Sequence, residues 1–288
     1  MTPAGEPEKL DDLKVGLRRL GRVVVAFSGG ADSAFLARVA TDALGADRVL
    51  CVTAVSPSLA PEELADCRSL AGEWGLNWRE VATDEMTRTA YRANDGDRCY
   101  HCKASLLDVL TPLAAAEAST VVLGVNVDDL GDHRPGQRAA SERGARFPLV
   151  EAGFSKLDVR RSSRRLGLRT WDKPAAACLA SRVPYGTPVT LGTLTTVADA
   201  ESGLRALGFR QLRVRHYGDL ARLEFDTDEL GRAVELREQV VEAVRRAGYT
   251  YVTLDLEGFR SGNLNDALSL PSDTDAGRAQ PAPTKGSS

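Results

Sequence analysis

Short apolar runs alternate with amphipathic segments along the first half of the chain. Runs rich in β-branched residues predict buried strands at 23–27, 48–55, 77–81 and 120–123. Apolar positions at helical spacing predict helices at 10–20, 34–40, 61–74 and 103–116. Strands and helices that alternate in this way form a doubly wound parallel sheet with helices on both faces. The expected fold class is therefore α/β, with ligands bound at the carboxyl ends of the strands.

The second half of the chain has a different pattern. Arg, Gly and Pro content predicts loops at 133–148 and 171–188. Periodicity predicts helices at 155–166, 191–207 and 228–247, and strands at 211–216, 221–225 and 249–256. The later elements form a smaller α+β unit. We therefore expect a first domain at 1–186, a C-terminal α+β domain for substrate binding or oligomerisation at 187–270, and a disordered tail at 271–288.

Composition narrows the class of protein. The chain has 288 residues, 43 % of them hydrophobic, and its 37 basic and 40 acidic side chains give a net charge of −3. A chain with this balance has no net positive charge that would attract nucleic acid or a membrane surface. No apolar run approaches the roughly 20 residues that span a bilayer, and the polar N-terminus shows no signal-peptide core. The expected location is the cytoplasm, where the five cysteines are more suited to thiol, metal or catalytic chemistry than to disulfides.

A glycine-rich turn joins the strand at 23–27 to the next helical pattern. Its glycines let backbone N–H groups approach a phosphate, and the start of the helix favours negative charge. No Gly-Lys-Ser/Thr follows, so this is not the Walker loop; it resembles the pyrophosphate loop of enzymes that cleave ATP to AMP and pyrophosphate. The residues expected to hold ATP are Ser28, Gly29, Gly30, Asp32 and Ser33. A Gly-rich turn without a ligand is the alternative, and Asp32 either orients Mg²⁺ or the loop or caps the helix.

A second polar segment follows the strand at 120–123. It begins Gly-Val-Asn and continues with several carboxylates up to Asp132. Because the carboxyl ends of parallel strands meet at one edge of a sheet, we expect Gly124, Asn126 and Asp128 beside the pyrophosphate loop, where they suit Mg²⁺ and phosphate. The segment is similar to the corresponding part of NAD synthetases. An acidic surface loop is the alternative, and the roles of the individual carboxylates at 128–132 stay open.

Three cysteines lie in segments that suit sulfur or metal chemistry. Cys99 and Cys102 form a Cys-x-x-Cys, which can be a redox pair, half of a zinc site or part of an iron–sulfur site. No second Cys-x-x-Cys is present and there are only three histidines, which argues against a closed structural zinc site. Cys178 lies close to Arg182, just before a Pro-Gly segment. It is therefore either an activated thiol or a buried, inert one.

Arginines offer positive charge in two places. Arg213 and Arg215 alternate along a predicted strand and share one face, where two guanidiniums suit a phosphate or a carboxylate. A solvated strand face is the alternative. The basic run at 160–165 predicts a solvated helix face, with a nucleic-acid patch as the alternative. A divalent cation site in the C-terminal domain is a further option, with Glu224 as its candidate ligand.

Together these segments resemble one family, the ATP-dependent sacrificial sulfur transferases called LarE, which help to make the nickel-pincer nucleotide cofactor of lactate racemase. The resemblance runs from about residue 10 to residue 265, and it is carried by 28–33, 98–103, 177–186, 213–215 and 258–262. It implies that ATP, with Mg²⁺, adenylates a carboxylate of a pyridinium-3,5-dicarboxylate mononucleotide. Sulfur then displaces AMP and leaves a thiocarboxylate.

The resemblance also implies roles for individual residues. In the sacrificial branch of the family, the cysteine at the position of Cys178 gives up its sulfur and becomes dehydroalanine. Lys103 and Arg182 are then candidates for stabilising developing negative charge, and Arg213 and Arg215 for binding the phosphate of the nucleotide substrate. The family also implies a homo-oligomer, expected as a hexamer.

Cys99 and Cys102 distinguish this chain from strictly sacrificial members. Some relatives use three such cysteines to hold a 4Fe-4S cluster whose open iron carries a sulfide for transfer. Ligation by Cys99, Cys102 and Cys178 fits that branch, which we favour; Cys178 is then a ligand and not a donor. The remaining two cysteines, Cys51 on a strand and Cys67 on a helix, are expected to be core or incidental residues.

Other functions stay open at this point. A tRNA thiolase can use the same loop and three cysteines, but it needs an RNA-binding surface. An amidotransferase or synthetase of the NAD or GMP type uses ammonia and has no need of the three cysteines. A module that senses ATP or binds adenylate would release no pyrophosphate.

Overall fold

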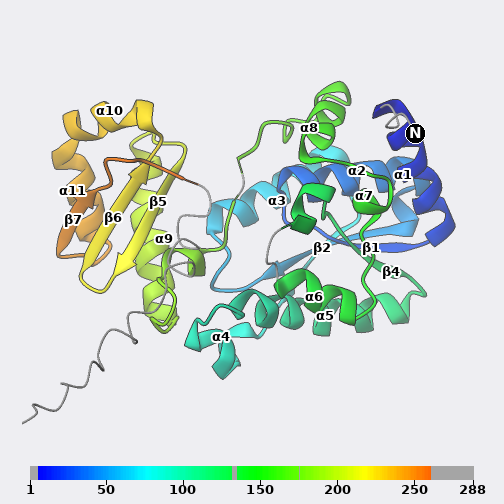
Figure 1. Cartoon of the computed structure of the whole chain (residues 1–288), viewed down its shortest axis with the longest axis horizontal. Coiled ribbons are helices and arrows are strands. Elements are labelled where there is room, and N and C mark those ends of the chain that lie inside the picture. The colour runs from blue at the N-terminus through cyan, green and yellow to red at the C-terminus, as the bar shows by residue number, and fades with distance from the viewer. Residues whose placement is uncertain (1–5, 132–134, 175, 261–288) are drawn as a thin grey trace, which may run out of the picture.

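The computed structural model describes residues 6–131, 135–174 and 176–260. Its larger sheet has parallel strands in the order β3-β2-β1-β4. These strands are β1 (Val23–Ala26), β2 (Val49–Val55), β3 (Trp78–Ala82) and β4 (Thr120–Leu123). Each predicted strand is confirmed to within one residue at either end. Figure 1 shows helices on both sides of this sheet, which confirms the α/β class.

Alternation along β1 assigns the helices to the two faces of the sheet. Val23 and Val25 belong to one hydrophobic core and Val24 to another. The first core includes side chains of α1 (Glu6–Leu20), α2 (Ala31–Leu44), α3 (Pro61–Trp74) and α8 (Lys156–Arg165). The second includes side chains of α5 (Arg98–Ala116) and α6 (Pro135–Glu142). Because helices cover both faces, the exposed carboxyl ends of the strands are where a ligand can reach the sheet.

The sequence prediction of a loop at 133–148 is wrong for most of that stretch. Its described part contains α6 and ends at the first residue of the single turn α7 (Pro148–Glu151). Each of these helices begins at a proline, which lacks the N–H that would otherwise be unpaired at the first helical position. The short helix α4 (Thr89–Ala93) was not predicted either. Turns of 3₁₀ helix lie at Ala46–Arg48, Glu85–Thr87, Val127–Gly131, Leu179–Arg182 and Thr227–Glu229.

A smaller sheet occupies the other end of the molecule (Figure 1). Its order is β5-β6-β7, with β5 antiparallel and β7 parallel to β6. The elements here are α9 (Leu191–Ala206), β5 (Leu212–Tyr217), β6 (Leu220–Phe225), α10 (Leu230–Glu235), α11 (Arg237–Arg246) and β7 (Tyr251–Leu254). Phe209 and Phe225 pack in a separate core, with ring centroids 4.5 Å apart. The predicted single helix at 228–247 is wrong, because the helix is interrupted at Leu236.

The predicted domain boundary near residue 186 falls between the 3₁₀ turn at 179–182 and α9, and it stays a prediction. Within the described ranges, no helix is long and apolar enough to cross a membrane. The predicted tail at 271–288 lies outside the described residues, as do Asp132, Ser261 and Gly262.

Candidate active site

The pyrophosphate loop follows β1 and leads directly into α2. Gly29 has φ +68°, in the left-handed region that glycine adopts without strain. Ser33 closes the loop, because its Oγ accepts the N–H of Ser28 at 3.2 Å and donates to the carbonyl of Gly30 at 3.2 Å. The Ser28 and Ser33 hydroxyls are 3.0 Å apart. The loop is thus preformed at the N-terminus of α2, where the helix dipole favours a phosphate.

Helix α3 packs behind the loop at Gly29. A Cβ at this position would lie 2.8 Å from Cys67 Sγ. Cys67 is fully buried, as expected, and burial raises the pKa of its thiol to about 11. Position 29 therefore requires glycine for two reasons, the backbone conformation and the lack of space.

The segment after β4 packs against the start of α2. A Cβ on Gly124 would lie 2.7 Å from the backbone N of Ser33, so glycine permits this close approach. Asn126 is 1 % exposed, and its Nδ2 donates to Asp32 Oδ1 at 3.1 Å. Its Oδ1 accepts the N–H of Asp128 at 3.0 Å. The structure therefore brings this segment and the pyrophosphate loop together at one edge of the sheet.

Helix α8 begins beside the same edge. Asp128 Oδ2 accepts the N–H of Lys156 at 2.8 Å, which fixes the first residue of α8. Burial is the largest influence on the pKa of Asp32 and raises it, and the carboxylate of Asp129 raises it further. Three neighbours lower the pKa of Asp32: the side-chain hydrogen bond from Asn126 and the charges of Lys156 and Arg160. Two cations of α8 thus lie near the carboxylate of the pyrophosphate loop.

The sequence pattern alone does not mark Lys156 or Arg160 as site residues. The basic run at 160–165 was expected to be solvated, and Arg161, Arg164 and Arg165 are indeed exposed, but Arg160 is half-buried. Among described residues, Arg160 Nε has no hydrogen-bond partner although it is buried. The available signal was the capping box that starts α8, in which Ser155 accepts the N–H of Asp158. It marks a helix start, but it does not show that this start lies at the sheet edge.

Cys178 lies near enough to Cys99 and Cys102 to influence the pKa of both thiols. Helix α5 begins at Arg98 and not at the predicted 103, so Cys99 and Cys102 lie on one face of its first turns. Loss of solvation is the largest influence on both thiols and the neighbouring Cys178 is the second, and both raise the pKa, that of Cys102 to about 12. Cys99 nevertheless stays exposed at the surface, whereas Cys102 is half-buried. Lys103 lowers both values, which places its ammonium near the thiols. In the part of the chain that the structure describes, no group of three or more His, Cys, Asp or Glu side chains is arranged to hold a metal ion.

Backbone hydrogen bonds hold the turn that follows Cys178. The N–H of Leu179 donates to the carbonyl of Ser58 at 2.8 Å, just beyond the end of β2. Arg98 is 4 % exposed, and its Nη1 donates to the carbonyl of Ala180 at 2.9 Å. The Cys178 turn is therefore fastened both to the edge that carries the pyrophosphate loop and to the start of α5.

Arg182 organises the same turn from the other side. Its Nη1 donates to the carbonyls of Ala177 and Cys178 at 2.6 and 3.0 Å. Its Nε and Nη2 pair with the two carboxylate oxygens of Glu201 at 2.7 and 3.0 Å. Arg182 is 2 % exposed and Glu201 is fully buried. These contacts make Arg182 a structural support of the turn, and its expected role in stabilising developing charge stays a prediction.

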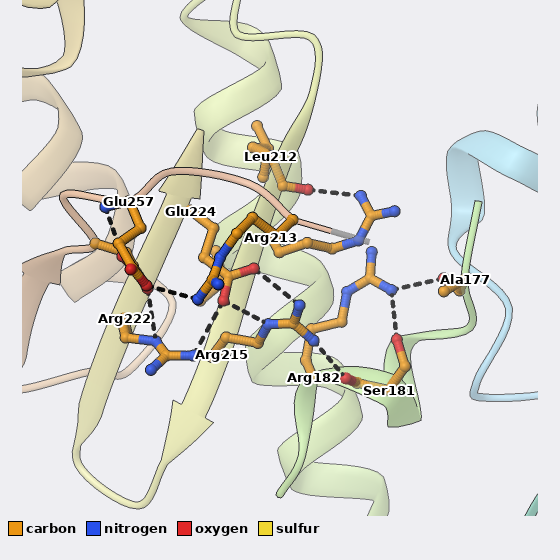
Figure 2. Close-up of polar contacts among 12 residues, drawn as sticks. Ala177, Ser181, Arg182, Leu212, Arg213, Arg215, Arg222, Glu224 and Glu257 are labelled. Atoms are coloured by element: carbon orange, nitrogen blue, oxygen red, sulfur yellow. Dashed lines mark hydrogen bonds and ion pairs between the residues drawn. The ribbon is translucent and has the colours of Figure 1, made fainter. Parts of the chain in front are cut away.

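Figure 2 shows the guanidiniums of Arg182, Arg213 and Arg215 between the second sheet and the Cys178 turn. Arg213 stacks over Phe259, with its guanidinium carbon 4.9 Å from the ring centroid. Burial, and next the charge of Arg182, lower the pKa of Arg213 to about 10. A phosphate beside these guanidiniums would relieve that repulsion.

Arg215 connects this cluster to the turn. Its Nε and Nη2 form a bidentate pair with Glu224 at 2.9 and 2.8 Å, and its Nη1 donates to the carbonyl of Ser181 at 2.8 Å. Glu224 Oε1 also accepts from Arg222 at 3.1 Å. Both carboxylate oxygens of Glu224 are thus paired with guanidiniums in this arrangement, so Glu224 supports arginine placement here.

Some known proteins are similar to only the first third of this chain, and others are similar to nearly all of it. The family model for NAD synthase matches residues 12–104, which include the pyrophosphate loop. A glutamine-dependent NAD(+) synthetase of Aquifex aeolicus is 32 % identical over 103 residues, which cover 34 % of this chain and 18 % of that protein. These matches support a nucleotide-binding fold for the first sheet. The family model does not extend to the second sheet.

Further relatives match nearly the whole chain. An uncharacterized protein of Synechocystis sp. is 48 % identical over 263 residues, 90 % of this chain and 98 % of that protein. The pyridinium-3,5-bisthiocarboxylic acid mononucleotide synthase of Lactiplantibacillus plantarum is 41 % identical over 257 residues, 89 % of this chain and 93 % of that protein. Because this identity extends over both the pyrophosphate-loop sheet and the arginine-bearing second sheet, the chain belongs to the LarE family.

Proposed function

We propose that this protein is an ATP-dependent sulfur transferase that converts a carboxylate of pyridinium-3,5-biscarboxylate mononucleotide into a thiocarboxylate. The reaction would serve the synthesis of the nickel-pincer nucleotide cofactor of lactate racemase. The name of the relative from Lactiplantibacillus plantarum states a bisthiocarboxylic acid mononucleotide as its product. That relative is matched over 93 % of its length, so the likeness includes the parts of the chain that would bind both ATP and the second substrate.

One observation carries the proposal: the turn that bears Cys178 links the two anion sites. On one side, the N–H of Leu179 donates a hydrogen bond to the carbonyl of Ser58, at the edge of the sheet that carries the pyrophosphate loop. On the other side, the carbonyl of Ser181 accepts from Arg215 in the arginine cluster. A sulfur at position 178 therefore lies between a site suited to ATP and a site suited to the phosphate of a mononucleotide.

The residues at the sheet edge fit ATP and Mg²⁺. Mg²⁺ prefers oxygen ligands and is usually held by one or two carboxylates together with phosphate oxygens. Asp32 and Asp129 are close enough for the charge of one to raise the pKa of the other, and a divalent cation would remove that repulsion. Asp32 and Asp129 would hold the ion, and Lys156 and Arg160 would face the pyrophosphate.

The proposed reaction has two steps. A carboxylate oxygen of the substrate attacks the α-phosphorus of ATP, and pyrophosphate leaves. A sulfur nucleophile then attacks the acyl carbon of the mixed anhydride, and AMP leaves with that carboxylate oxygen. Adenylation is needed because a carboxylate is a poor acyl donor, and sulfur suits the second step because thiolates are strong nucleophiles. Lys103 and the buried Arg98 would offset the negative charge that develops there.

For the sulfur source, we propose that Cys99, Cys102 and Cys178 form one centre that holds a 4Fe-4S cluster. The donor set has the right chemistry for such a cluster, because three thiols from two separate segments are neighbours: Cys178 raises the pKa of both Cys99 and Cys102. A cluster held by three thiolates has one open iron and would supply a sulfide for transfer. In the sacrificial alternative, the Cys178 sulfur bonds to the acyl carbon, its Cβ–S bond breaks as the Cα proton is removed, and dehydroalanine remains.

The protein is proposed to act in the cytoplasm as a homo-oligomer. None of the five cysteines is in a disulfide, which fits a reducing compartment. Large apolar side chains are exposed on the part that carries the second sheet, including Leu191, Val234, Tyr251 and Leu256. Contact between copies would remove such side chains from water.

The function can be tested with the purified protein, ATP, Mg²⁺ and the biscarboxylate mononucleotide. We expect AMP, pyrophosphate and thiocarboxylate in equal amounts, and the Cys178→Ser variant should still form AMP but no thiocarboxylate. An amide formed with ammonium in place of a thiocarboxylate would favour the amidotransferase reading. Thiolated tRNA would favour the tRNA thiolase, and absence of pyrophosphate with every substrate would favour an ATP-binding module.

The sulfur source needs a separate measurement. Iron and acid-labile sulfide are determined on protein purified without oxygen, together with its visible spectrum. We expect about four irons per chain and brown absorbance, both lost in the Cys99→Ser variant. Absence of iron after reconstitution would overturn the cluster, and the intact mass after one reaction should then decrease by one hydrogen sulfide.

A further inference from the structure

We propose that Lys173 is a positioning residue that holds the segment carrying Cys178 in register with the pyrophosphate loop. The inference rests on the proposed function, because it assigns a coupling role between ATP cleavage and sulfur transfer. Lys173 was not among the residues singled out from the sequence.

The ammonium of Lys173 joins the loop to α3. Its Nζ donates to the carbonyl of Gly29 at 3.2 Å, to Glu63 Oε2 at 2.8 Å and to Asp66 Oδ2 at 2.6 Å. These three acceptors use all three donors of an ammonium group. The side chain of Lys173 is 17 % exposed, so the contacts are shielded from water and from salt more than those of a surface ion pair.

The acidic partners of Lys173 are themselves held in place. Asp66 Oδ1 pairs with Arg169 at 2.7 Å, and Glu73 Oε2 pairs with Arg169 Nε at 2.8 Å. Arg169 and Lys173 belong to the same segment. Two cations of this segment therefore form ion pairs with acidic side chains of α3. Of these two, Lys173 also reaches the pyrophosphate loop.

The segment after Lys173 leads to the sulfur site. Cys178 follows Lys173 by five positions in the sequence. Directly after Cys178 in the sequence, the N–H of Leu179 donates a hydrogen bond to the carbonyl of Ser58, which lies between β2 and α3. Cys178 is thus bracketed by two contacts to the edge where ATP would bind. Since misplacement of a reacting group by about 1 Å can cost about 100-fold in rate, loss of the Lys173 contact should affect the transfer step more than adenylation.

A purely structural role for Lys173 predicts a different result. If Lys173 only stabilised the fold, a Lys173→Met variant would lose thermal stability while AMP and thiocarboxylate fell together. A positioning role predicts that the ratio of thiocarboxylate to AMP falls, because the mixed anhydride forms and is then lost to water. The ratio therefore separates the two roles.

The experiment compares the full-length protein with the variants Lys173→Met, Lys173→Arg and Arg169→Met. Arg169→Met is the matched control, because Arg169 shares Asp66 with Lys173 but does not touch Gly29. With ATP, Mg²⁺ and the biscarboxylate mononucleotide, we expect the ratio of thiocarboxylate to AMP to fall about tenfold in Lys173→Met. It should be unchanged from wild type in Arg169→Met, and Lys173→Arg should recover most of the loss.

A second readout does not need the mononucleotide. The alkylation rate of Cys178 by iodoacetamide, followed by peptide mass spectrometry, should rise several-fold in Lys173→Met and not in Arg169→Met. Unchanged alkylation together with an unchanged product ratio would overturn the proposal for Lys173 and leave the proposed function intact. Absence of thiocarboxylate with the wild-type protein would count against the function itself, and the alkylation result would then decide on Lys173 alone.

A folding defect in Lys173→Met would not prevent the test. Glu63→Gln removes the charge of one acceptor of the ammonium and leaves Asp66 and Gly29 in place. We expect a decrease of about twofold in the product ratio for this variant, and an unchanged ratio would overturn the proposal.

Discussion

Asn126 donates a 3.1 Å hydrogen bond from its Nδ2 to Oδ1 of Asp32, between the segment after β4 and the start of α2. The amide is 1 % exposed and its Oδ1 accepts the N–H of Asp128. Asn126 therefore sets the orientation of the Asp32 carboxylate while fixing the acidic segment beside it. Segments from two neighbouring strands thus act together at the expected magnesium site.

Asn126→Ala should weaken the use of Mg²⁺ and ATP. The variant frees Asp32 to rotate and leaves the N–H of Asp128 without its acceptor, so we expect the KM for ATP to rise about tenfold. Pyrophosphate release measured over a range of ATP concentrations checks this. Asn126→Asp keeps the acceptor for Asp128 but adds a like charge beside Asp32, so it should be at least as impaired; a normal KM in both variants would contradict the assignment.

Gly29→Ala should abolish ATP binding through two separable effects. The added Cβ meets Cys67 Sγ at 2.8 Å, and the φ of +68° costs a non-glycine residue about 1 kcal/mol. A Cys67→Ala background removes the first effect and keeps the second. Calorimetric titration with ATP should therefore show no binding in Gly29→Ala and partial recovery in the double variant. Full binding by Gly29→Ala alone would mean that the loop tolerates a side chain.

The positions of the strands and of the pyrophosphate loop could be predicted because their signals are local. A β-branched run followed by glycine fixes β1 and Gly29 without knowledge of distant residues. The start of α5 was missed for the opposite reason. Arg98 is a charged residue whose guanidinium is buried, and it donates hydrogen bonds to nearby Asn94 and to Ala180, which lies far along the chain. In the sequence alone it looks like part of a polar loop.

The sequence predicts those site residues that belong to a local motif, and it does not predict those that reach the site through distant contacts. Residues within a motif, such as Cys99 and Cys102, could be named from their spacing. Lys156, Arg160 and Lys173 gain their importance from contacts with the pyrophosphate loop or its surroundings, and such contacts depend on how α8 and the following segment fold back over the sheet edge. No local pattern distinguishes them from solvated cations.

Arg182→Met should destabilise the protein and disorder the Cys178 turn. The change leaves Glu201 buried with Arg205 as its remaining guanidinium partner, at a cost of about 3 kcal/mol in the free energy of unfolding. Urea unfolding measures this cost. Arg205→Met is the control, since Arg205 is 28 % exposed in its side chain and its loss should cost about 1 kcal/mol. Equal losses in both variants would contradict the special role of Arg182.

Asp158 should make stability depend on acidity. Burial alone would raise its pKa, but hydrogen bonds from Lys9 and Ser155 lower it to about 2. Because the folded-state pKa lies below the unfolded one, the contribution is fully present at neutral pH and is lost as pH falls from about 4 towards 2.

Asp158→Asn should therefore lose about 1 kcal/mol of unfolding free energy at pH 7. The difference from wild type should shrink as the pH is lowered through 4, which urea unfolding at several pH values would show. Glu151→Gln is a suitable control, because Glu151 belongs to an exposed pair with Arg146. A difference that stays constant with pH would contradict the assignment.

The central claim, that ATP activates a carboxylate for attack by sulfur, is tested most directly by following oxygen. The biscarboxylate mononucleotide is prepared with a heavy oxygen isotope in its carboxylates and incubated with the protein, ATP and Mg²⁺, and the AMP is analysed by mass spectrometry. The account predicts one heavy oxygen in each AMP released and none in the pyrophosphate. AMP without the label, formed alongside thiocarboxylate, would contradict it.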